Sequence, residues 1–213
     1  MTSPHWNDRA MQQLVRYESL FALLSELQSQ EDISKMAQAV ARQFKYIASV
    51  VSYRLIVKLD VGFAILQGHR GSGHAERVLT LSPWEAQQWQ HCTPWCAPQA
   101  TRTPDAPAPE IFQDPKLTEV NVLPVVQNGT CTGLLVAGAR HHPFSALDHR
   151  FMRLLALYLE ERVAALLMRQ RAMEALLSKA STDALTGLLN HGTILERLNS
   201  QLALSRRTSL PLC

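Results

Sequence analysis

The sequence Val122-Leu123-Pro124-Val125-Val126-Gln127-Asn128-Gly129 is followed closely by the apolar run Gly133-Leu134-Leu135. Asn-Gly is a strongly favoured pair in two-residue turns between antiparallel strands, because both residues tolerate a positive φ. The apolar runs on either side therefore predict a hairpin, with strands at 119–126 and 130–139. The second strand carries almost no polar residue, which predicts a central position with little solvent on either face.

Further strands precede this hairpin. Apolar residues alternate with mostly polar ones over 51–59, which predicts a half-buried strand. Residues 63–67 and 77–81 predict two shorter strands. The intervening glycines Gly68, Gly71 and Gly73 predict a loose loop between them.

Helical periodicity marks the rest of the chain. Apolar residues recur at three- and four-residue steps over 6–28, and again up to about residue 44 after a break, where Ser29 or Asp32 is a candidate N-cap. Ser82-Pro83 predicts the start of a helix that reaches about Cys92. Ser145, with Asp148 at the capping-box position, predicts a helix that continues to about residue 179.

The segment 93–118 behaves differently, because it holds six of the eleven prolines of the chain. Proline excludes a long helix and a central strand. A loop of this length inside a compact domain is usually functional or disordered.

The last long helix carries a heptad-like stripe in its second half. Apolar residues at alternating three- and four-residue steps predict a seam that packs against a second copy of the chain, with Gln170 as a polar layer that helps to fix the register. Packing on the domain's own sheet is the alternative. The predicted dimer seam consists of Leu159, Val163, Leu166, Gln170, Met173 and Leu177.

Composition excludes several classes of protein. The 213 residues carry a net charge of only +3, and no Lys/Arg block is dense enough to predict nucleic-acid binding. No apolar run approaches the ~18 residues of a membrane span, and the first nine residues lack the pattern of a secretory signal. Four cysteines are too few for a disulfide scaffold. We expect a cytoplasmic protein with reduced thiols, no membrane contact and no nucleic-acid partner.

The order of elements resembles that of a GAF domain over roughly residues 15–165. The most family-like piece is the quoted hairpin, from Val122 to Leu135. The resemblance implies an α+β fold, in which flanking helices cover an antiparallel sheet and a long C-terminal coiled-coil helix follows. It also implies a possible small-molecule ligand between the sheet and its covering loops. A PAS-like sensor sheet is the structural competitor.

A second resemblance begins at Ser181. Residues 183–190, Asp-Ala-Leu-Thr-Gly-Leu-Leu-Asn, look like the motif that opens GGDEF domains, the catalytic domains of diguanylate cyclases. Local geometry, with Gly187 ending one helix and Asn190 capping the next, accounts for part of the string. His191 departs from the family, which usually has Arg there. The matching positions are Asp183, Leu185, Thr186, Gly187, Leu188 and Asn190.

This resemblance implies a division of the chain and a function. The expected parts are an N-terminal helix (1–30), a GAF-like core (31–145), a signalling and dimerisation helix (146–180) and the incomplete start of a GGDEF domain (181–213). The family's Mg²⁺ and GTP sites lie in later motifs, so we expect no catalytic residue and no cofactor within the 213 residues. We expect a sensory region that controls cyclic di-GMP synthesis through dimer geometry. The alternative is a stand-alone dimeric GAF module that binds a ligand or senses redox state.

One cluster has the composition of a redox or ligand site. His91, Cys92, Trp95 and Cys96 lie within six residues. A Cys-x-x-x-Cys pair with an adjacent His falls short of the four ligands that zinc takes, so we assign no metal. The cluster is therefore either a reactive thiol pair or a set of ordinary loop residues. Trp84, Trp89 and Trp95 either line a ligand pocket in the region 82–118 or cover the sheet, and we favour the cover.

Overall fold

The computed structural model describes residues 4–97, 107–181, 186 and 188–208. The chain divides into two compact units, residues 1–165 and 166–213. The first unit therefore includes the N-terminal helix and the beginning of the long helix, which the sequence analysis assigned to separate segments. Asp183, Leu185 and Gly187 of the GGDEF-like motif lie outside the described residues.

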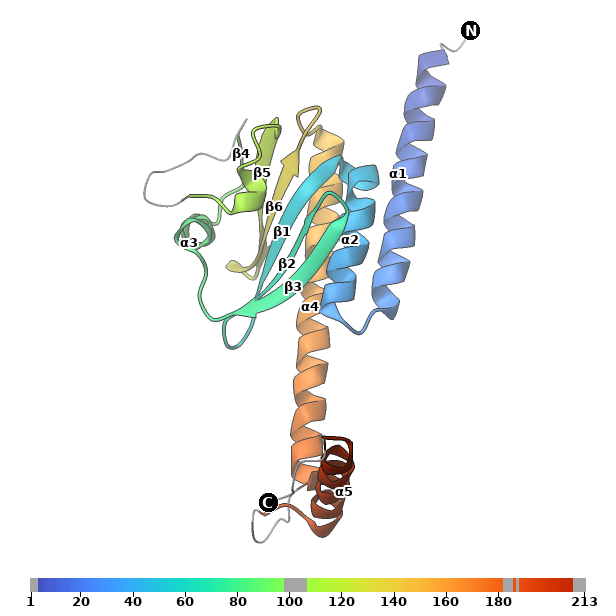
Figure 1. The fold of residues 1–213 in the computed structure, drawn as a ribbon. Coiled ribbons are helices and arrows are strands. Elements are labelled where there is room, and N and C mark those ends of the chain that lie inside the picture. Colours follow the sequence, from blue (N-terminus) through green and yellow to red (C-terminus); the bar gives the residue numbers. More distant parts are fainter. Residues whose placement is uncertain (1–3, 98–106, 182–185, 187, 209–213) are drawn as a thin grey trace. The chain divides into compact units, whose positions relative to one another are not determined.

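A six-stranded antiparallel sheet forms the centre of the first unit (Figure 1). Its strand order is β3-β2-β1-β6-β5-β4, so β6 is central, as its apolar sequence predicted. The strands are β1 (Val50–Lys58), β2 (Phe63–His69), β3 (Ser72–Val78), β4 (Trp95–Ala97), β5 (Glu119–Gln127) and β6 (Thr130–Ala139).

Helices cover both faces of this sheet (Figure 1). The helices α1 (Pro4–Ser29) and α2 (Ile33–Ala48) and the part of α4 (Ala146–Ser181) up to residue 165 lie on one side. The helix α3 (Pro83–His91) and the short 3-10 helix η1 (Glu110–Phe112) lie on the other. An apolar cluster that includes Trp84, Phe112 and Leu134 fills the space on this second side.

Most of the predicted caps and turns are present. Asp32 accepts hydrogen bonds from the backbone of Ser34 and Lys35 at the start of α2. Ser82 and Glu85 form a complete capping box on α3, and Ser145 and Asp148 bond to each other's backbone and side chain at the start of α4. Asn128 and Gly129 both have positive φ, as the predicted hairpin turn requires.

The predicted loose loop over Gly68, Gly71 and Gly73 is wrong. Gly68 lies in β2, Gly73 lies in β3, and the chain turns tightly at Arg70-Gly71, where both residues have positive φ. A Cβ on Gly68 would lie 2.4 Å from the Tyr53 ring, and one on Gly73 would lie 2.4 Å from the Ala37 carbonyl. These two glycines therefore permit α2 to pack closely on the sheet, which a sequence pattern alone does not distinguish from loop flexibility.

The first half of α4 belongs to the core of the domain. Phe151, Leu155 and Leu159 are buried, and so are Val163 and Leu166. We therefore correct the assignment of Leu159, Val163 and Leu166 from a dimer seam to the core, because the single chain already buries them. Gln170 is half-buried, Met173 is 56% exposed, and the Leu177 side chain lies outside the described residues.

The second unit contains the end of α4 and the helix α5 (His191–Thr208). The Asn190 side chain accepts a hydrogen bond from the Thr193 backbone at 2.9 Å, so Asn190 caps α5 as predicted. Apolar residues at three- and four-residue steps form an exposed stripe on α5. The stripe consists of Ile194, Leu195, Leu198 and Leu202.

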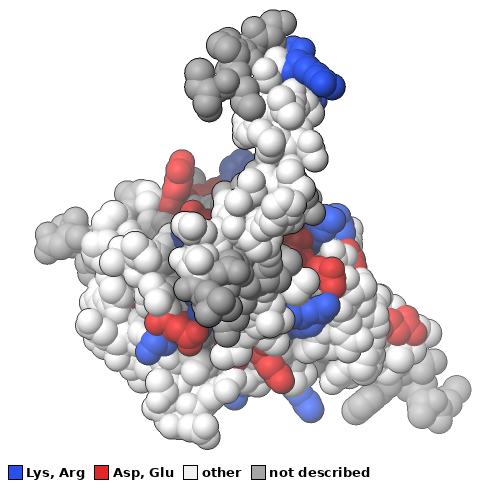
Figure 2. Space-filling model, turned by 90° about the horizontal axis from the view of Figure 1, so that it is seen from below, with Lys and Arg blue, Asp and Glu red and all other residues white. Residues whose placement is uncertain are grey.

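The described surface is mixed in charge. On the face shown in Figure 2, basic and acidic side chains are interspersed and most of the surface is uncharged. Among the described helices, none combines the length and the apolar character that crossing a membrane requires.

Candidate functional site

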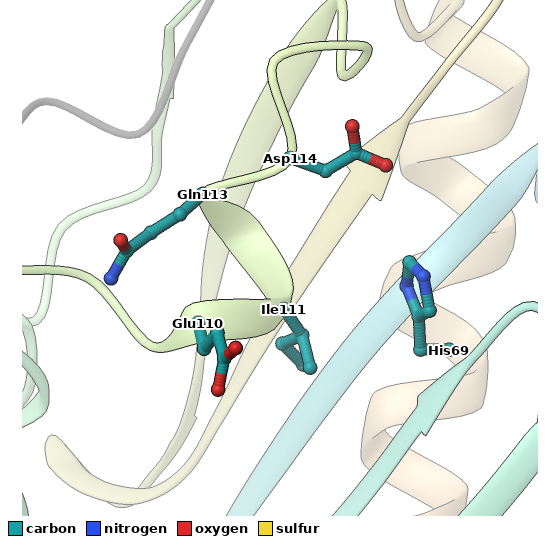
Figure 3. Close-up of a pocket in the computed structure, with 5 residues that line it drawn as sticks. All are labelled: His69, Glu110, Ile111, Gln113 and Asp114. Atoms are coloured by element: carbon teal, nitrogen blue, oxygen red, sulfur yellow. The ribbon is translucent and has the colours of Figure 1, made fainter.

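A pocket of about 480 Å³ opens beside the 3-10 helix η1. Its wall comes from two parts of the chain that are distant in sequence, the end of β2 and the segment that contains η1 (Figure 3). The lining residues are His69, Glu110, Ile111, Gln113 and Asp114. An imidazole, two carboxylates and an amide beside one apolar side chain suit a small polar molecule.

The sheet positions His69. It is the last residue of β2, and it lies opposite Ser52 in the register of β1 and β2. The Ser52 hydroxyl hydrogen-bonds to the imidazole Nδ1 at 2.7 Å. This bond fixes the ring and leaves Nε2 as the nitrogen for a ligand.

The segment after η1 positions Asp114. Its Oδ1 accepts a hydrogen bond from the Lys116 backbone at 2.9 Å, and its Oδ2 forms an ion pair with Arg70 at 2.9 Å. Arg70 belongs to the tight β2–β3 turn, so the ion pair joins the two walls of the pocket. In Figure 3, Asp114 extends toward the side that carries His69, whereas Gln113 extends away from it. The Gln113 amide donates to the Ala108 carbonyl at 2.6 Å.

The electrostatics of the pocket favour a neutral imidazole and an ionised carboxylate. Burial lowers the pKa of His69 below its usual 6.5, and the nearby Arg70 cation lowers this pKa further. The backbone bond from Lys116 and the bond from Arg70 lower the pKa of Asp114. At neutral pH the pocket therefore offers a neutral His69, which both donates and accepts hydrogen bonds, beside a negatively charged Asp114.

The shift of the His69 pKa predicts a pH dependence of stability. Below pH 6.5 the unfolded chain binds a proton at His69 that the folded domain binds less readily. The contribution of His69 to the free energy of unfolding is therefore complete above pH 6.5. It declines as the pH falls from 6.5 toward the pKa of His69 in the folded domain. We expect an NMR titration of the His69 ring to give a midpoint below 6.5. In urea unfolding across this range, His69→Gln should reduce the loss of stability on acidification, and an unchanged pH profile would contradict this account.

The residues that the sequence suggested as a redox or ligand site do not line this pocket. His91 ends α3 and its Nδ1 bonds to the Gln87 carbonyl, while Cys92 caps the same helix with a φ of +48°. Cys96 lies in β4 opposite Asn121, and the side chains of Trp95 and Cys96 lie outside those described. Among the described residues, no group of three or more His, Cys, Asp or Glu side chains has the arrangement of a metal site.

Trp84 and Trp89 cover the sheet, which is the interpretation that the sequence analysis favoured over a ligand pocket. Trp84 is buried in the apolar cluster, and Trp89 packs against it with its ring 5.2 Å from that of Phe63.

The sequence analysis singled out the proline-rich segment but missed Glu110, Gln113 and Asp114 within it. It also missed His69, which it placed in a loop. The available signal was the Arg70-Gly71 pair. A tight turn there extends β2 as far as His69, which lines the pocket.

Comparison with known proteins identifies the fold. No protein-family model and no curated protein matches the sequence. The GAF domain of a phosphoenolpyruvate-protein phosphotransferase from Coxiella burnetii aligns with a TM-score of 0.53 and 14% identity, over 76% of this chain and 98% of that one. The GAF domain of an Acinetobacter phosphoenolpyruvate-protein phosphotransferase aligns with a TM-score of 0.51 and 13% identity, over 70% and 92% of the two chains. The chain contains a GAF fold.

This GAF fold confirms the predicted class, an antiparallel sheet with flanking helices. At these identities the likeness concerns the fold alone. The pocket of this GAF domain must therefore be interpreted from its own residues. The predicted coiled coil and the GGDEF-like start have no counterpart in these comparisons and stay predictions.

Proposed function

We propose that this chain is the regulatory region of a diguanylate cyclase. In this proposal the GAF domain receives a signal, and α4 carries it to a GGDEF-type domain that begins near residue 181. The observation that carries the proposal is the continuity of α4, a single helix of 36 residues from Ala146 to Ser181. One helix thus joins the core of the GAF domain to the GGDEF-like motif.

The start of α4 is well suited to respond to changes in the domain. Asp148 completes the capping box with Ser145 and forms an ion pair with Arg16 of α1, while Arg16 also donates to the Ile47 carbonyl at the end of α2. Farther along, the Tyr158 hydroxyl bonds to the Leu24 carbonyl of α1. Polar contacts and buried apolar side chains therefore couple the position of α4 to α1 and α2.

The later part of α4 supports contact with a second copy of the chain. Among the described side chains of α4, Leu167 is the last buried apolar one, and the larger apolar ones beyond it are exposed, with Met168 at 62%, Met173 at 56% and Leu176 at 63%. The described α5 has its own exposed stripe, from Ile194 to Leu202. In the proposal, a partner helix covers the end of α4, and the remainder of a GGDEF-type domain covers α5. Mg²⁺ and GTP would bind in that remainder.

The pocket beside η1 is the proposed entry point of the signal. A small polar ligand between His69 and Asp114 would bridge β2 and the η1 segment beside the Arg70–Asp114 ion pair. The same pocket favours the second candidate function, a stand-alone dimeric module that binds a ligand or senses redox state without a catalytic domain. The two functions differ in what the gene encodes after residue 213.

Insertions that rotate the end of α4 distinguish the two candidate functions. In the complete gene product, inserting two residues after Met173 rotates the following part of α4 by roughly 200°, whereas inserting seven residues restores nearly the same phase. We expect conversion of GTP to cyclic di-GMP by the parent protein, a large change in rate on the two-residue insertion, and a rate near that of the parent on the seven-residue insertion. A parent protein without this activity would overturn the proposal in favour of the stand-alone module.

A further inference from the structure

Two cysteines that are distant in sequence meet at one end of the sheet. Cys92 caps α3, and Cys131 is the second residue of β6. The Cys131 thiol donates a hydrogen bond to the Gly133 carbonyl at 3.3 Å, and the Cys92 side chain lies near enough to raise the pKa of Cys131. Cys131 is buried and Cys92 is partly exposed. The sequence analysis paired Cys92 with Cys96, which is nearer in sequence, and did not consider Cys131.

A β-bulge brings these thiols together. The register of β5 and β6 shifts between Val125 and Val126, so that Val126 lies opposite Cys131 while Val125 lies opposite Gly133. Paired residues share a face of a sheet and neighbours along a strand alternate, so the bulge turns Cys131 to the face opposite that of Gly133. Leu134 lies on this face with the α3 residue Trp84 in one apolar cluster. Cys131 therefore points to the side of the sheet on which α3 ends.

We propose that Cys92 and Cys131 form a reversible disulfide that staples the end of α3 to the β5–β6 hairpin. Both residues lie where the backbone can adjust. Cys92 ends its helix in the left-handed conformation and precedes a segment without regular structure, and Cys131 lies two residues from the Asn128-Gly129 turn. Adjustment of these two segments is what would bring the sulfurs to the bond length of about 2.0 Å.

Hydrogen peroxide is the oxidant that fits this pair. The partly exposed Cys92 sulfur attacks one peroxide oxygen, the O–O bond breaks, and a sulfenic acid and one water form. The Cys131 sulfur then attacks the Cys92 sulfur, and the displaced hydroxide leaves with the Cys131 proton as a second water. Two thiols are oxidised by two electrons in total, and one peroxide is reduced to two waters.

The burial of Cys131 sets the order of these steps. Burial, followed by the neighbouring Cys92, raises the pKa of Cys131 to about 12, so this thiol is protonated at neutral pH and is a poor first nucleophile. Cys92 is the accessible member of the pair. The Lys58 cation acts on Cys131 in the opposite direction, which favours the thiolate when that sulfur attacks.

The hairpin that would be stapled also contacts α4. The Gln127 amide donates to the buried Glu160 carboxylate of α4 at 2.6 Å, and a Cβ on Gly133 would lie 3.2 Å from the Glu160 side chain. This end of the hairpin therefore lies between Cys92 on one face of the sheet and Glu160 on the other. That the disulfide regulates output through α4 rests on the function proposed above.

The test uses the full chain with Cys96→Ser and Cys213→Ser, which leaves only the two proposed partners. After treatment with hydrogen peroxide we expect both thiols to disappear from a titration under denaturing conditions. We also expect a linked peptide pair containing Cys92 and Cys131, and restoration of both thiols by dithiothreitol. Adding Cys92→Ser should leave the Cys131 thiol titratable after the same treatment. Two titratable thiols after peroxide treatment, or links between chains instead of within one, would overturn the disulfide.

A second measurement tests the connection to α4. In the complete gene product with the same two serines, we expect peroxide to change the rate of cyclic di-GMP synthesis at least several-fold, and we expect Cys92→Ser to abolish that response. A linked peptide pair without any change in rate would overturn the link to α4 while leaving the disulfide in place. A parent without cyclase activity would refute the proposed function alone, because the thiol titration does not depend on it.

Discussion

Phe151→Ala is expected to lower the free energy of unfolding of the GAF domain by about 3–5 kcal/mol, the usual range for removing a buried aromatic ring. Phe151 lies in the first turns of α4 and is 1% exposed. Its ring makes an edge contact with Tyr17 of α1 at 4.9 Å, and the Arg16 guanidinium lies over it at 5.3 Å. The substitution therefore leaves a cavity at the contact between α1 and α4 and removes an aromatic and a cation–π contact.

Urea unfolding of the parent and the variant measures this loss. Leu154→Ala is the matched control, because Leu154 lies one turn away on the same helix and is 47% exposed. We expect a change below about 1 kcal/mol for the control, since little buried surface is removed. Equal effects of the two substitutions would contradict the packing of α4 against the domain described here.

Glu85→Ala is the second substitution with a large expected effect. The Glu85 side chain is 2% exposed and forms an ion pair with Arg54 of β1, whose side chain is 13% exposed. The same carboxylate accepts hydrogen bonds from the backbone and hydroxyl of Ser82 at the start of α3. Removing it leaves Arg54 without its buried counter-charge and α3 without half of its capping box. We expect a loss of about 3–5 kcal/mol, typical of breaking one side of a buried ion pair.

Glu76→Ala tests whether burial of the carboxylate, and not its charge alone, determines how much stability its removal costs. Glu76 lies 3.5 Å from the same Arg54, but its side chain is 45% exposed. Solvent screens such a pair, so we expect a loss of no more than about 1 kcal/mol. Thermal or urea unfolding of both variants compares them directly. A loss for Glu76→Ala as large as that for Glu85→Ala would show that burial does not decide the strength of these pairs.

Local signals predicted most of the fold. The Asn128-Gly129 turn and the apolar runs beside it located the central hairpin, and Ser82, Asp32 and Ser145 located three helix starts, because caps and tight turns depend on neighbouring residues. The short edge strand β4 was missed, since three residues between prolines carry too little periodicity. The strand β2 was predicted too short and β3 was placed too late, at 77–81 instead of Ser72–Val78, because glycines required for close packing of α2 resemble those of a loop.

The candidate site was less predictable, because long-range contacts create it. His69 and Asp114 meet only through the sheet register and the position of η1, and neither residue belongs to a sequence motif. A β-bulge likewise turns Cys131 to the face of the sheet on which α3 ends, whereas spacing in the sequence offered only the nearer Cys96 as a partner for Cys92. The predicted apolar stripe is present on α4, but its first half packs inside the domain. Periodicity identifies an apolar side of a helix and does not identify what covers it.

The central claim is that α4 passes from the GAF core into a dimeric signalling helix. Light scattering measures it directly, by giving the molecular mass in solution of residues 1–213 and of a shorter chain that ends at Leu167, the last residue that is buried among the described side chains of α4. We predict a dimer for the longer chain and a folded monomer for the shorter one. Monomers in both cases, or dimers in both, would contradict a dimer seam in the exposed end of α4.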